Sequence, residues 1–164
     1  MKRQIIRGLF AGCFVIGLSL GLEPVMAKDD TVLIDPELHA LLTKYHAALQ
    51  NQDLDAVVKT YAPGPDTVLL GTGPGERWLG QLAIQDAYQH FFADYDPGTM
   101  QINCGSQASG VAENLAWLLV ACDYSDSQKA QKRQYGVNVS AVAEKQDGVW
   151  RFRAFHFSNL TGGQ

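Results

Sequence analysis

Two residues in the C-terminal half of the sequence, Asp123 and His156, have side chains that can act as general bases. Removing a proton next to a carbonyl group needs a carboxylate or imidazole in a desolvated site, together with a donor that stabilises the oxyanion. Five further residues can donate hydrogen bonds or anchor a flat ligand: Tyr61, Trp78, Asn138, Arg153 and Ser158. These residue types permit acid–base chemistry on a small organic molecule.

Both candidate bases also have an ordinary structural interpretation. Asp123 stands just before Tyr124-Ser-Asp126, so it can simply mark the point where a strand leaves the core for solvent. His156 stands in an aromatic run, where a buried hydrogen-bonded imidazole or an exposed one is commoner than a catalyst. Residue type alone does not separate these interpretations from catalysis.

The candidate anchors have the same ambiguity. Tyr61 and Trp78 can stack on a flat ligand, but such side chains more often fill the core. Arg153 alternates with Arg151, so both can lie on one ion-paired face. A single guanidinium inside an apolar cavity would instead favour an anionic ligand.

Three amphipathic helices are predicted in the first half of the chain. Asp35 before Pro36 is typical of a helix start, since Asp caps free amides and Pro is favoured at the first helical position. Apolar residues then recur at helical spacing as far as Leu49. Asp53 caps a second, short helix, and a third is predicted over residues 81–95.

The second half of the chain is predicted to be strand. A short strand at 67–70 is followed, after the third helix, by strands at 99–107, 114–124, about 133–145 and 149–159. This order is typical of an α+β domain with three N-terminal helices packed on one face of a curved antiparallel β-sheet. In the last strand the alternation changes character near Ala154, which predicts a bulge or a change of burial there.

The strand at 114–124 is apolar on both faces. Leu118 and Val120 lie on one side, and Trp117 and Leu119 on the other. Three helices can cover only one face of a sheet of this size, so we expect the second face to meet a partner subunit or to enclose a pocket.

The two cysteines beyond the N-terminal segment are a candidate disulfide. A hairpin centred on residue 113 would place Cys104 opposite Cys122, and facing cysteines at a close cross-strand pair lie near disulfide reach. The alternative is a pair of small buried thiols that pack as hydrophobic groups. A metal site built from two cysteines without a nearby pair of histidines is not expected.

Other motifs with known chemistry are missing from the sequence. His39, His46 and His90 fall on predicted helices, mostly off the apolar stripe, and are expected to be solvated. No Ser-His-Asp order or His-x-x-x-His spacing supports a hydrolase or a metalloenzyme. The glycine-rich segment 71–80 lacks the Gly-Lys-Ser/Thr ending of a phosphate-binding loop, so it predicts an irregular turn. We therefore expect no metal and no cofactor.

The first 27 residues have the pattern of a secretory signal peptide, with cations before residue 8, an apolar run over 8–22 and a small residue at Ala27. A membrane anchor is an alternative, but a spanning helix needs about 20 apolar residues. Acylation at Cys13 is a second alternative. Cleavage followed by a short lead at 28–35 predicts a periplasmic or secreted protein without a stable membrane anchor.

The charge balance argues against a nucleic-acid partner. Cleavage would remove three of the 13 Lys and Arg and one of the 17 Asp and Glu, leaving 10 against 16 and a net charge of −6. Such a surface repels polyanions, and no basic stripe with interleaved aromatic residues is visible.

Residues 36–161 resemble the nuclear transport factor 2-like superfamily, in its SnoaL-like branch. Three segments carry the resemblance: Leu49-Gln-Asn-Gln-Asp-Leu-Asp-Ala56, Leu70-Gly-Thr-Gly-Pro-Gly-Glu-Arg-Trp-Leu-Gly80 and Trp150-Arg-Phe-Arg-Ala-Phe-His-Phe-Ser-Asn159. Their order and spacing match the family, although Gly73 and Gly75 replace acidic or small residues in the loop. The resemblance implies a cone-like fold, a homodimer formed through the outer face of the sheet, and a mostly apolar cavity.

Family members include ketosteroid isomerase, scytalone dehydratase and polyketide cyclases, but also proteins that only bind, so fold does not decide function. Our principal hypothesis is an exported domain that binds a small, largely apolar organic ligand. The alternatives are a cofactor-free isomerase, cyclase or dehydratase that uses Asp123 or His156, and a dimerisation module without a ligand. Whether the protein is an enzyme stays open at this point.

Overall fold

A computed structural model of the protein describes residues 34–159. The predicted signal peptide, and the lead as far as residue 33, lie outside the described residues. In chain order the elements are α1 (Pro36–Gln50), α2 (Leu54–Lys59), β1 (Val68–Leu70), β2 (Arg77–Leu79), α3 (Gly80–Ala93), β3 (Gln101–Ala112), β4 (Leu115–Gln128), β5 (Gln131–Gln146) and β6 (Val149–Asn159). Within this part of the chain, no helix has both the length and the apolar character needed to cross a membrane.

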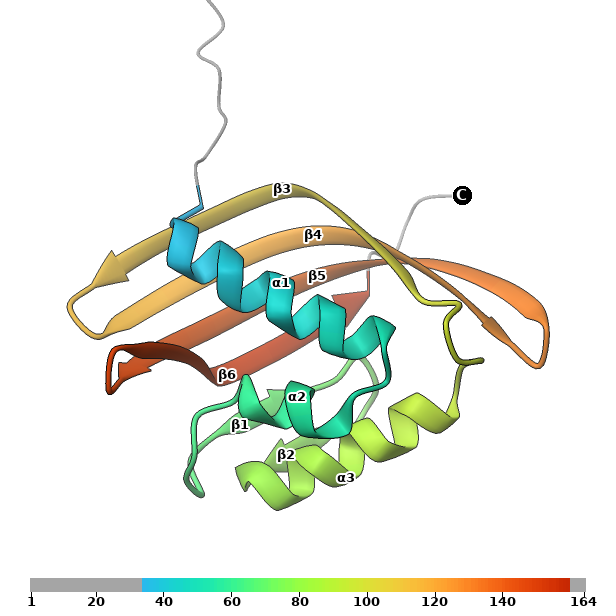
Figure 1. Ribbon diagram of the computed structural model, residues 1–164, viewed down its shortest axis with the longest axis horizontal. Helices are drawn as coiled ribbons and strands as arrows, with labels where there is room; N and C mark the ends of the chain where they lie inside the picture. Colours follow the sequence, from blue (N-terminus) through green and yellow to red (C-terminus); the bar gives the residue numbers. More distant parts are fainter. Residues whose placement is uncertain (1–33, 160–164) are drawn as a thin grey trace, which may run out of the picture. The chain divides into compact units, whose positions relative to one another are not determined.

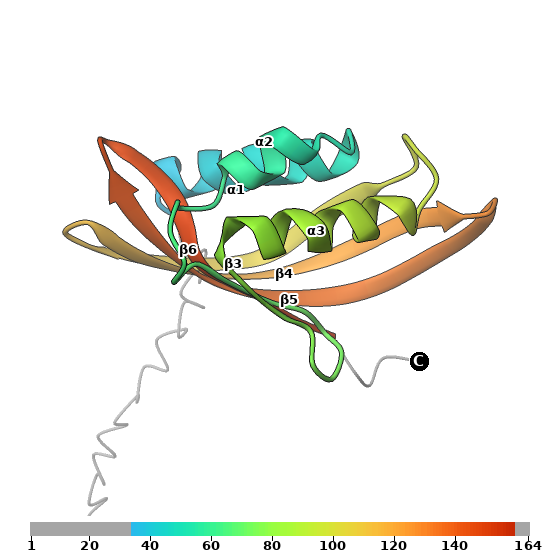
Figure 2. The ribbon, with the colours of Figure 1, turned by 90° about the horizontal axis from the view of Figure 1, so that it is seen from below.

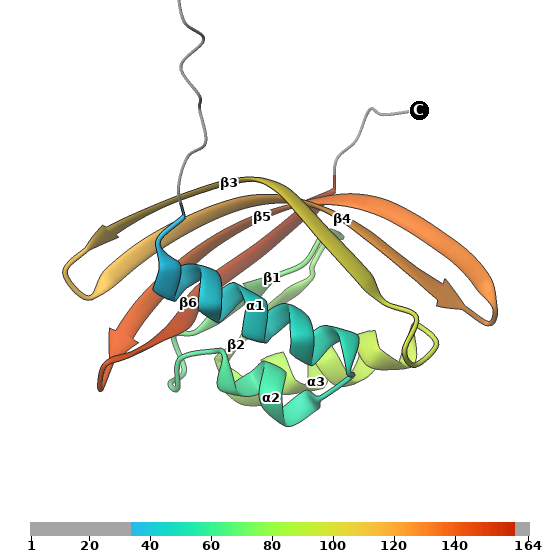
Figure 3. The same ribbon diagram turned by 45° about the horizontal axis from the view of Figure 1, so that its top comes forward.

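The strands form one curved sheet in the order β2-β1-β6-β5-β4-β3 (Figure 1). Neighbouring strands are antiparallel, apart from β1 and β6, which run parallel. The long strands arch over α1, and all three helices lie on the concave side of the sheet (Figures 2 and 3). This arrangement confirms the predicted α+β class with helices on one face.

The predicted caps begin the first two helices. Asp35 Oδ1 accepts hydrogen bonds from the backbone amide of Glu37, at 2.9 Å, and from that of the next residue. Asp53 Oδ1 accepts one from the amide of Ala56, also at 2.9 Å. Each carboxylate satisfies amides that the start of a helix leaves free. No side chain caps α3, which begins at Gly80, where a φ of +76° suits glycine.

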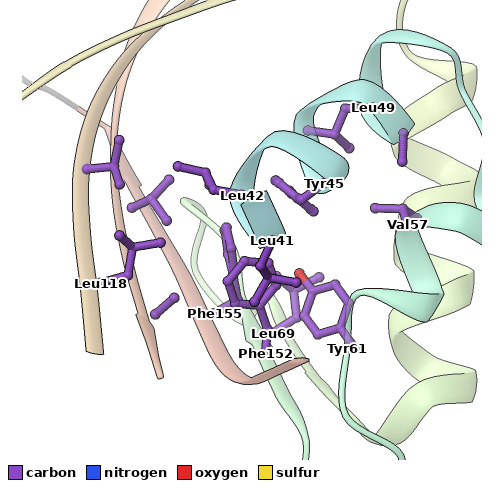
Figure 4. Packing of buried hydrophobic residues seen from close by; sticks show 14 of the residues in the cluster. Leu41, Leu42, Tyr45, Leu49, Val57, Tyr61, Leu69, Leu118, Phe152 and Phe155 are labelled. Atoms are coloured by element: carbon purple, nitrogen blue, oxygen red, sulfur yellow. The ribbon is translucent and has the colours of Figure 1, made fainter. Parts of the chain in front are cut away.

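The core fills the space between α1 and the concave face of the sheet (Figure 4). α1 contributes the apolar face that its spacing predicted: Leu38, Leu41, Leu42, Tyr45 and Leu49. Opposite them, Phe152 and Phe155 of β6 meet edge to face with ring centroids 4.7 Å apart. Burying a side chain of this size contributes about 1.5–3 kcal/mol to stability. The core therefore ties the helices to the strand at the middle of the sheet.

The glycine-rich segment 71–80 is more regular than predicted. Only its first part is a turn, in which Glu76 accepts a hydrogen bond from the amide of Gly73 at 2.7 Å. Its second part forms β2, which pairs antiparallel with β1, so that Trp78 lies opposite Leu69. The sequence signal was obscured because β2 has only three residues and glycines flank it on both sides.

β6 contains the irregularity predicted near Ala154. Val142 pairs with Ala154, but the next residue of β5 pairs with Phe152, so Arg153 is an extra residue in β6. Strand side chains alternate between faces, and one extra residue reverses the faces that follow it. Phe152 and Phe155 consequently both point into the core, although three positions separate them.

The extra residue is held by a network of polar contacts. The Arg153 guanidinium donates to Glu144 Oε2 at 2.6 Å and to Asp66 Oδ1 at 2.8 Å. It also donates to the hydroxyl of Thr67 at 3.0 Å and to the carbonyl of Pro63 at 3.1 Å. Arg153 thus connects the bulge to the segment that precedes β1. Of the two interpretations offered by the sequence, the ion-paired one describes this residue.

A disulfide joins the edge strand β3 to its neighbour β4. Cys104 lies opposite Cys122, the pair expected from the hairpin register, and their sulfur atoms are bonded at 2.05 Å. The register then shifts by one residue in β3, so that Gln107 pairs with Val120. The bridge therefore closes the strand pair immediately beside a bulge.

Candidate functional site

A cavity of about 510 Å³ lies between the inner face of the sheet and the helices α1 and α3. Its walls are predominantly aromatic and aliphatic, formed by Tyr45, Leu49, Leu69, Trp78, Ala87, Tyr88, Phe91, Tyr124, Tyr135, Val137 and Phe157. Its polar lining residues are Thr72, Glu76, His90, Asp94, Arg133 and Asn159. A volume in this range accommodates an ordinary small ligand.

A chain of three tyrosine hydroxyls lies behind the inner wall. Tyr88 of α3 is central, with its hydroxyl oxygen 2.9 Å from that of Tyr45 and 2.6 Å from that of Tyr61. Burial raises the pKa of all three phenols well above the usual range, so they stay neutral. The hydroxyls satisfy one another and thereby allow three polar groups to be buried in an aromatic core.

Tyr124 of β4 also lines the cavity, but its hydroxyl differs from those three. Its ring stacks on that of Tyr135, with centroids 5.7 Å apart and an interplanar angle of 22°. The Tyr135 hydroxyl donates to Asp126 Oδ2 at 3.0 Å, whereas the Tyr124 hydroxyl is buried and has no partner among the described residues. Burial raises the pKa of Tyr124. A buried hydroxyl without a hydrogen bond costs stability.

The charged groups at one side of the cavity neutralise one another. Arg133 donates to Asp126 Oδ1 at 2.6 Å and to Asp94 Oδ2 at 2.9 Å. The hydrogen bonds to Asp126 are the main reason that the pKa of Arg133 is raised. Since two carboxylates already hold the guanidinium, it is not an unpaired cation that could capture an anionic ligand.

Among the described lining residues, none supplies a desolvated general base. The two carboxylates at the cavity, Glu76 and Asp94, are exposed to solvent, and so is His90. Glu76 is engaged with the amide of Gly73, and Asp94 with Arg133. A general base for proton abstraction next to a carbonyl must be shielded from water and in contact with the substrate, and these three exposed side chains are not shielded. The lining is suited to holding an apolar molecule.

Trp78 and Tyr61 are the predicted site residues that lie closest to this cavity. Trp78 lines it directly from β2. Tyr61 is fully buried one layer deeper, where its hydroxyl pairs with that of Tyr88. Arg153 lies in its ion-pair network and does not line the cavity.

The other predicted site residues gather on the outer face of the sheet. Asn138 pairs with Ser158, and His156 pairs with Ser140, in adjacent rows of β5 and β6. Asp123 is exposed on β4, between the inward-facing Cys122 and Tyr124. Neither Asp123 nor His156 lines the cavity, so a role as its catalytic base has no geometric support.

The bulge at Arg153 explains this placement. Uninterrupted alternation would put His156 on the same face as Trp150 and Phe152, which are buried. The extra residue reverses the pattern, so that Phe157 faces the cavity and His156 faces outward. The sequence predicted the irregularity but not its effect on the faces.

The tyrosines of the cavity were missed as site residues, although the sequence contained their signal. Tyr45 and Tyr88 fall on the apolar stripes of two predicted helices, and Tyr124 falls on the predicted inner face of a strand. Such positions favour the core, which is where most aromatic side chains with this spacing lie. Each of them carries a hydroxyl group on an inward-facing ring, and this shared feature could have identified them as candidate site residues.

His46 departs from the expectation of a solvated side chain. Its ring packs against Tyr45, with centroids 5.6 Å apart, and against Tyr124 at 6.4 Å. Burial lowers the pKa of His46 to about 4, with a smaller contribution from His39. His46 lies directly after a core residue of α1, and curvature of the sheet brings it under cover.

Comparisons with known proteins agree with this fold. The family model described as SnoaL-like domain matches residues 38–161. A ketosteroid isomerase-like protein from Erwinia carotovora atroseptica shares 19% identity over 82% of this chain and 100% of that chain, with a TM-score of 0.64. A nuclear transport factor 2 (NTF2-like) superfamily protein from Salmonella enterica shares 16% identity over 78% and 95%, with a TM-score of 0.67.

A third structure, an NTF2-like protein of unknown function from Pseudomonas putida, shares 17% identity over 74% of this chain and 83% of that chain, with a TM-score of 0.61. At such identities the likeness to these structures shows the common fold alone. No curated protein sequence matches the chain significantly.

Two tyrosine-to-phenylalanine variants test how much the buried hydroxyl groups contribute to stability. Tyr88→Phe leaves the hydroxyls of Tyr45 and Tyr61 unpartnered, so we expect the free energy of unfolding to fall by about 1–3 kcal/mol. Tyr124→Phe removes a buried hydroxyl that has no partner within residues 34–159, so stability should stay the same or rise by up to about 1 kcal/mol. Urea unfolding followed by circular dichroism measures both. Equal losses in the two variants would contradict this assignment.

Proposed function

Because the chain belongs to the family of SnoaL-like domains, we propose that its cavity binds a small, largely apolar aromatic molecule. The family comprises ligand-binding proteins and enzymes of the isomerase or dehydratase type, so membership alone does not choose between them. One observation supports binding most directly: a cavity of about 510 Å³ is walled mainly by aromatic and aliphatic side chains, its two carboxylates are exposed, and its one lining arginine is ion-paired.

The lining favours a flat and uncharged ligand. Rings from α3, β2, β4 and β6 face the cavity, among them Phe91, Trp78, Tyr124 and Phe157. Such rings stack on flat apolar molecules at little cost in conformational entropy. Glu76 and Asp94 add negative charge to the edge, and Arg133 is already paired with two carboxylates. Among the described lining residues, an anionic ligand would thus meet no unpaired cation.

The enzymatic alternative receives less support from the same residues. One similar structure is described as ketosteroid isomerase-like. Proton abstraction next to a carbonyl requires a desolvated base in contact with the substrate. At the described cavity the carboxylates and the imidazole are exposed, Arg133 is ion-paired, and burial keeps the tyrosine phenols neutral. The cavity can therefore bind a ligand in its present geometry, whereas proton abstraction would require one of these side chains to move into a shielded position.

Two fluorescent probes that share one aromatic skeleton test this proposal. Neutral N-phenyl-1-naphthylamine should bind with one site per chain, and its sulfonated analogue, 1-anilinonaphthalene-8-sulfonate, should bind at least about tenfold more weakly. The difference arises because burying an unpaired sulfonate is costly. Fluorescence titration measures both affinities.

A matched pair of variants locates the bound probe. Ala87 of α3 lines the cavity, so Ala87→Phe should fill it and weaken binding of the neutral probe at least about tenfold. Ala93 is exposed at the end of the same helix, and Ala93→Phe should leave binding unchanged. Failure of the wild-type protein to bind the neutral probe, equal affinity for the two probes, or no effect of Ala87→Phe would overturn the proposal.

We also propose that the protein is a homodimer formed through the outer face of the sheet. Leu115, Trp117 and Leu119 of β4 and Val142 of β5 are exposed there by 48, 47, 49 and 40% respectively. Trp117 and Val142 are direct cross-strand partners, and Gly110 opposite Trp117 leaves room for the indole ring to lie flat on the sheet. A contiguous exposed apolar patch of this kind is typical of an interface.

A charged side chain within this patch tests the dimer. Leu119→Lys would bury an unpaired charge at the interface, so light scattering after gel filtration should give the mass of one chain where the wild type gives that of two. Leu82→Lys is the control, because Leu82 is 85% exposed on α3 and should not affect assembly. A monomeric wild-type protein, or a dimer that tolerates Leu119→Lys, would exclude this interface.

We propose finally that the chain is exported and cleaved after Ala27. The charged and apolar pattern of its first residues supports export, and so does the Cys104–Cys122 disulfide, because such bonds persist in oxidising compartments. Cell fractionation of a bacterial host should place the protein outside the cytoplasm, and mass spectrometry should find Lys28 as the first residue. An uncleaved cytoplasmic product would refute this.

A further inference from the structure

The disulfide lies beside the half-buried side chain of His46, so that two sulfur atoms and one ring nitrogen are close to one another. A ring nitrogen of His46 and the sulfur atoms of Cys104 and Cys122 all lie within 4.8 Å of one another. His46 belongs to α1, while the cysteines belong to β3 and β4, so three elements converge at this point. The cluster is distinct from the proposed ligand site, since none of the three residues lines the cavity.

Unpartnered polar atoms surround the same place. Within residues 34–159, the buried side-chain atoms without a hydrogen-bond partner are His46 Nε2, Gln107 Oε1 and the Tyr124 hydroxyl. In the register of β3 and β4, the Cys104–Cys122 pair lies between the Gln107–Val120 pair and the Ile102–Tyr124 pair. Since most buried polar atoms have a hydrogen-bond partner, the unpartnered His46 Nε2 beside two sulfur atoms is a nitrogen free to coordinate an ion.

We propose that reduction of the Cys104–Cys122 disulfide creates a zinc site formed by the two cysteine thiolates and His46. A dithiol reductant would pass two electrons and two protons to the disulfide, breaking the sulfur–sulfur bond and becoming a disulfide itself. The two resulting thiols then each lose a proton as Zn²⁺ binds. Two cysteines and one histidine are a ligand set that zinc accepts, with water completing the tetrahedron.

The geometry allows this set to close around an ion. Tetrahedral zinc with bonds of about 2.0–2.3 Å keeps its ligand atoms roughly 3.5 Å apart. The two sulfur atoms would separate on reduction, and the histidine nitrogen would approach them from within 4.8 Å. The bulge after Cys104 gives β3 the local freedom for such a change. The oxidised bridge offers no thiolate, so the site exists only in the reduced protein.

Cobalt titration under anaerobic conditions tests the site, because Co²⁺ occupies zinc sites and reports thiolate ligation by its absorption. The full mature chain is reduced with a phosphine, and circular dichroism establishes that it stays folded. Reduced protein should bind one Co²⁺ per chain with a thiolate-to-cobalt charge-transfer band in the near ultraviolet, and one equivalent of Zn²⁺ should abolish this band. Oxidised protein should show no such band.

Two histidine variants separate this site from ordinary thiol binding. His46→Ala should weaken Co²⁺ binding by at least about 10–100-fold, the effect that even loss of an outer-shell partner produces. His39→Ala should bind like the wild type, since His39 is exposed on the same helix. Cys104→Ser leaves one thiolate, so it should reduce the charge-transfer band to about half or less, with far-ultraviolet dichroism as the folding control.

Three results would overturn the proposal. The first is that the reduced wild-type protein binds no more Co²⁺ than the oxidised protein. The second is that the His46→Ala variant binds Co²⁺ as tightly as the His39→Ala variant. The third is that reduction unfolds the chain. The probe-binding measurements on the aromatic cavity do not depend on any of these results, so the two proposals can fail separately.

Discussion

One inserted residue determines which side chains of the last strand face the ligand cavity. Arg153 has no partner of its own in β5, and its insertion reverses the alternation of every residue that follows. Phe155 and Phe157 therefore point inward, toward the core and the cavity, while His156 points outward. The ion pairs of Arg153 with Glu144 and Asp66 stabilise this register, because slipping by one residue would break them. The composition of the cavity thus depends on a contact outside it.

The buried tyrosines of the core differ in whether their hydroxyl groups have hydrogen-bond partners. Tyr45, Tyr61 and Tyr88 satisfy one another, which accounts for three buried phenols without any appeal to function. Tyr124 is equally buried, but its hydroxyl has no partner in the part of the chain that the structure describes, and the ring of His46 packs beside it. An unpaired buried hydroxyl costs stability, so Tyr124 contributes less to the folded state than the three paired tyrosines do.

The fold was largely predictable because it depends on local patterns. Helical spacing defined the buried face of α1, and Asp35 and Asp53 marked helix starts that the structure confirms. The candidate site was predicted less well, because it depends on which face a residue occupies. Alternation fails at a bulge, so His156 was placed on the face of Trp150, from which the extra residue removes it. Helical spacing assigned His46 to solvent, since it gives no account of the sheet curving over α1.

β4 has an apolar side chain at nearly every position of its central part, but only one of its two faces is buried. Leu118 and Val120 on the inner face are fully buried by the helices, whereas Trp117 and Leu119 on the outer face are left half exposed. Burial in the monomer therefore explains only one of the two apolar sets. Exposing the second set to water is unfavourable, and the helices cannot reach around the sheet to cover it. Folding of a single chain therefore explains why the inner face is apolar. It does not explain why the outer face is apolar.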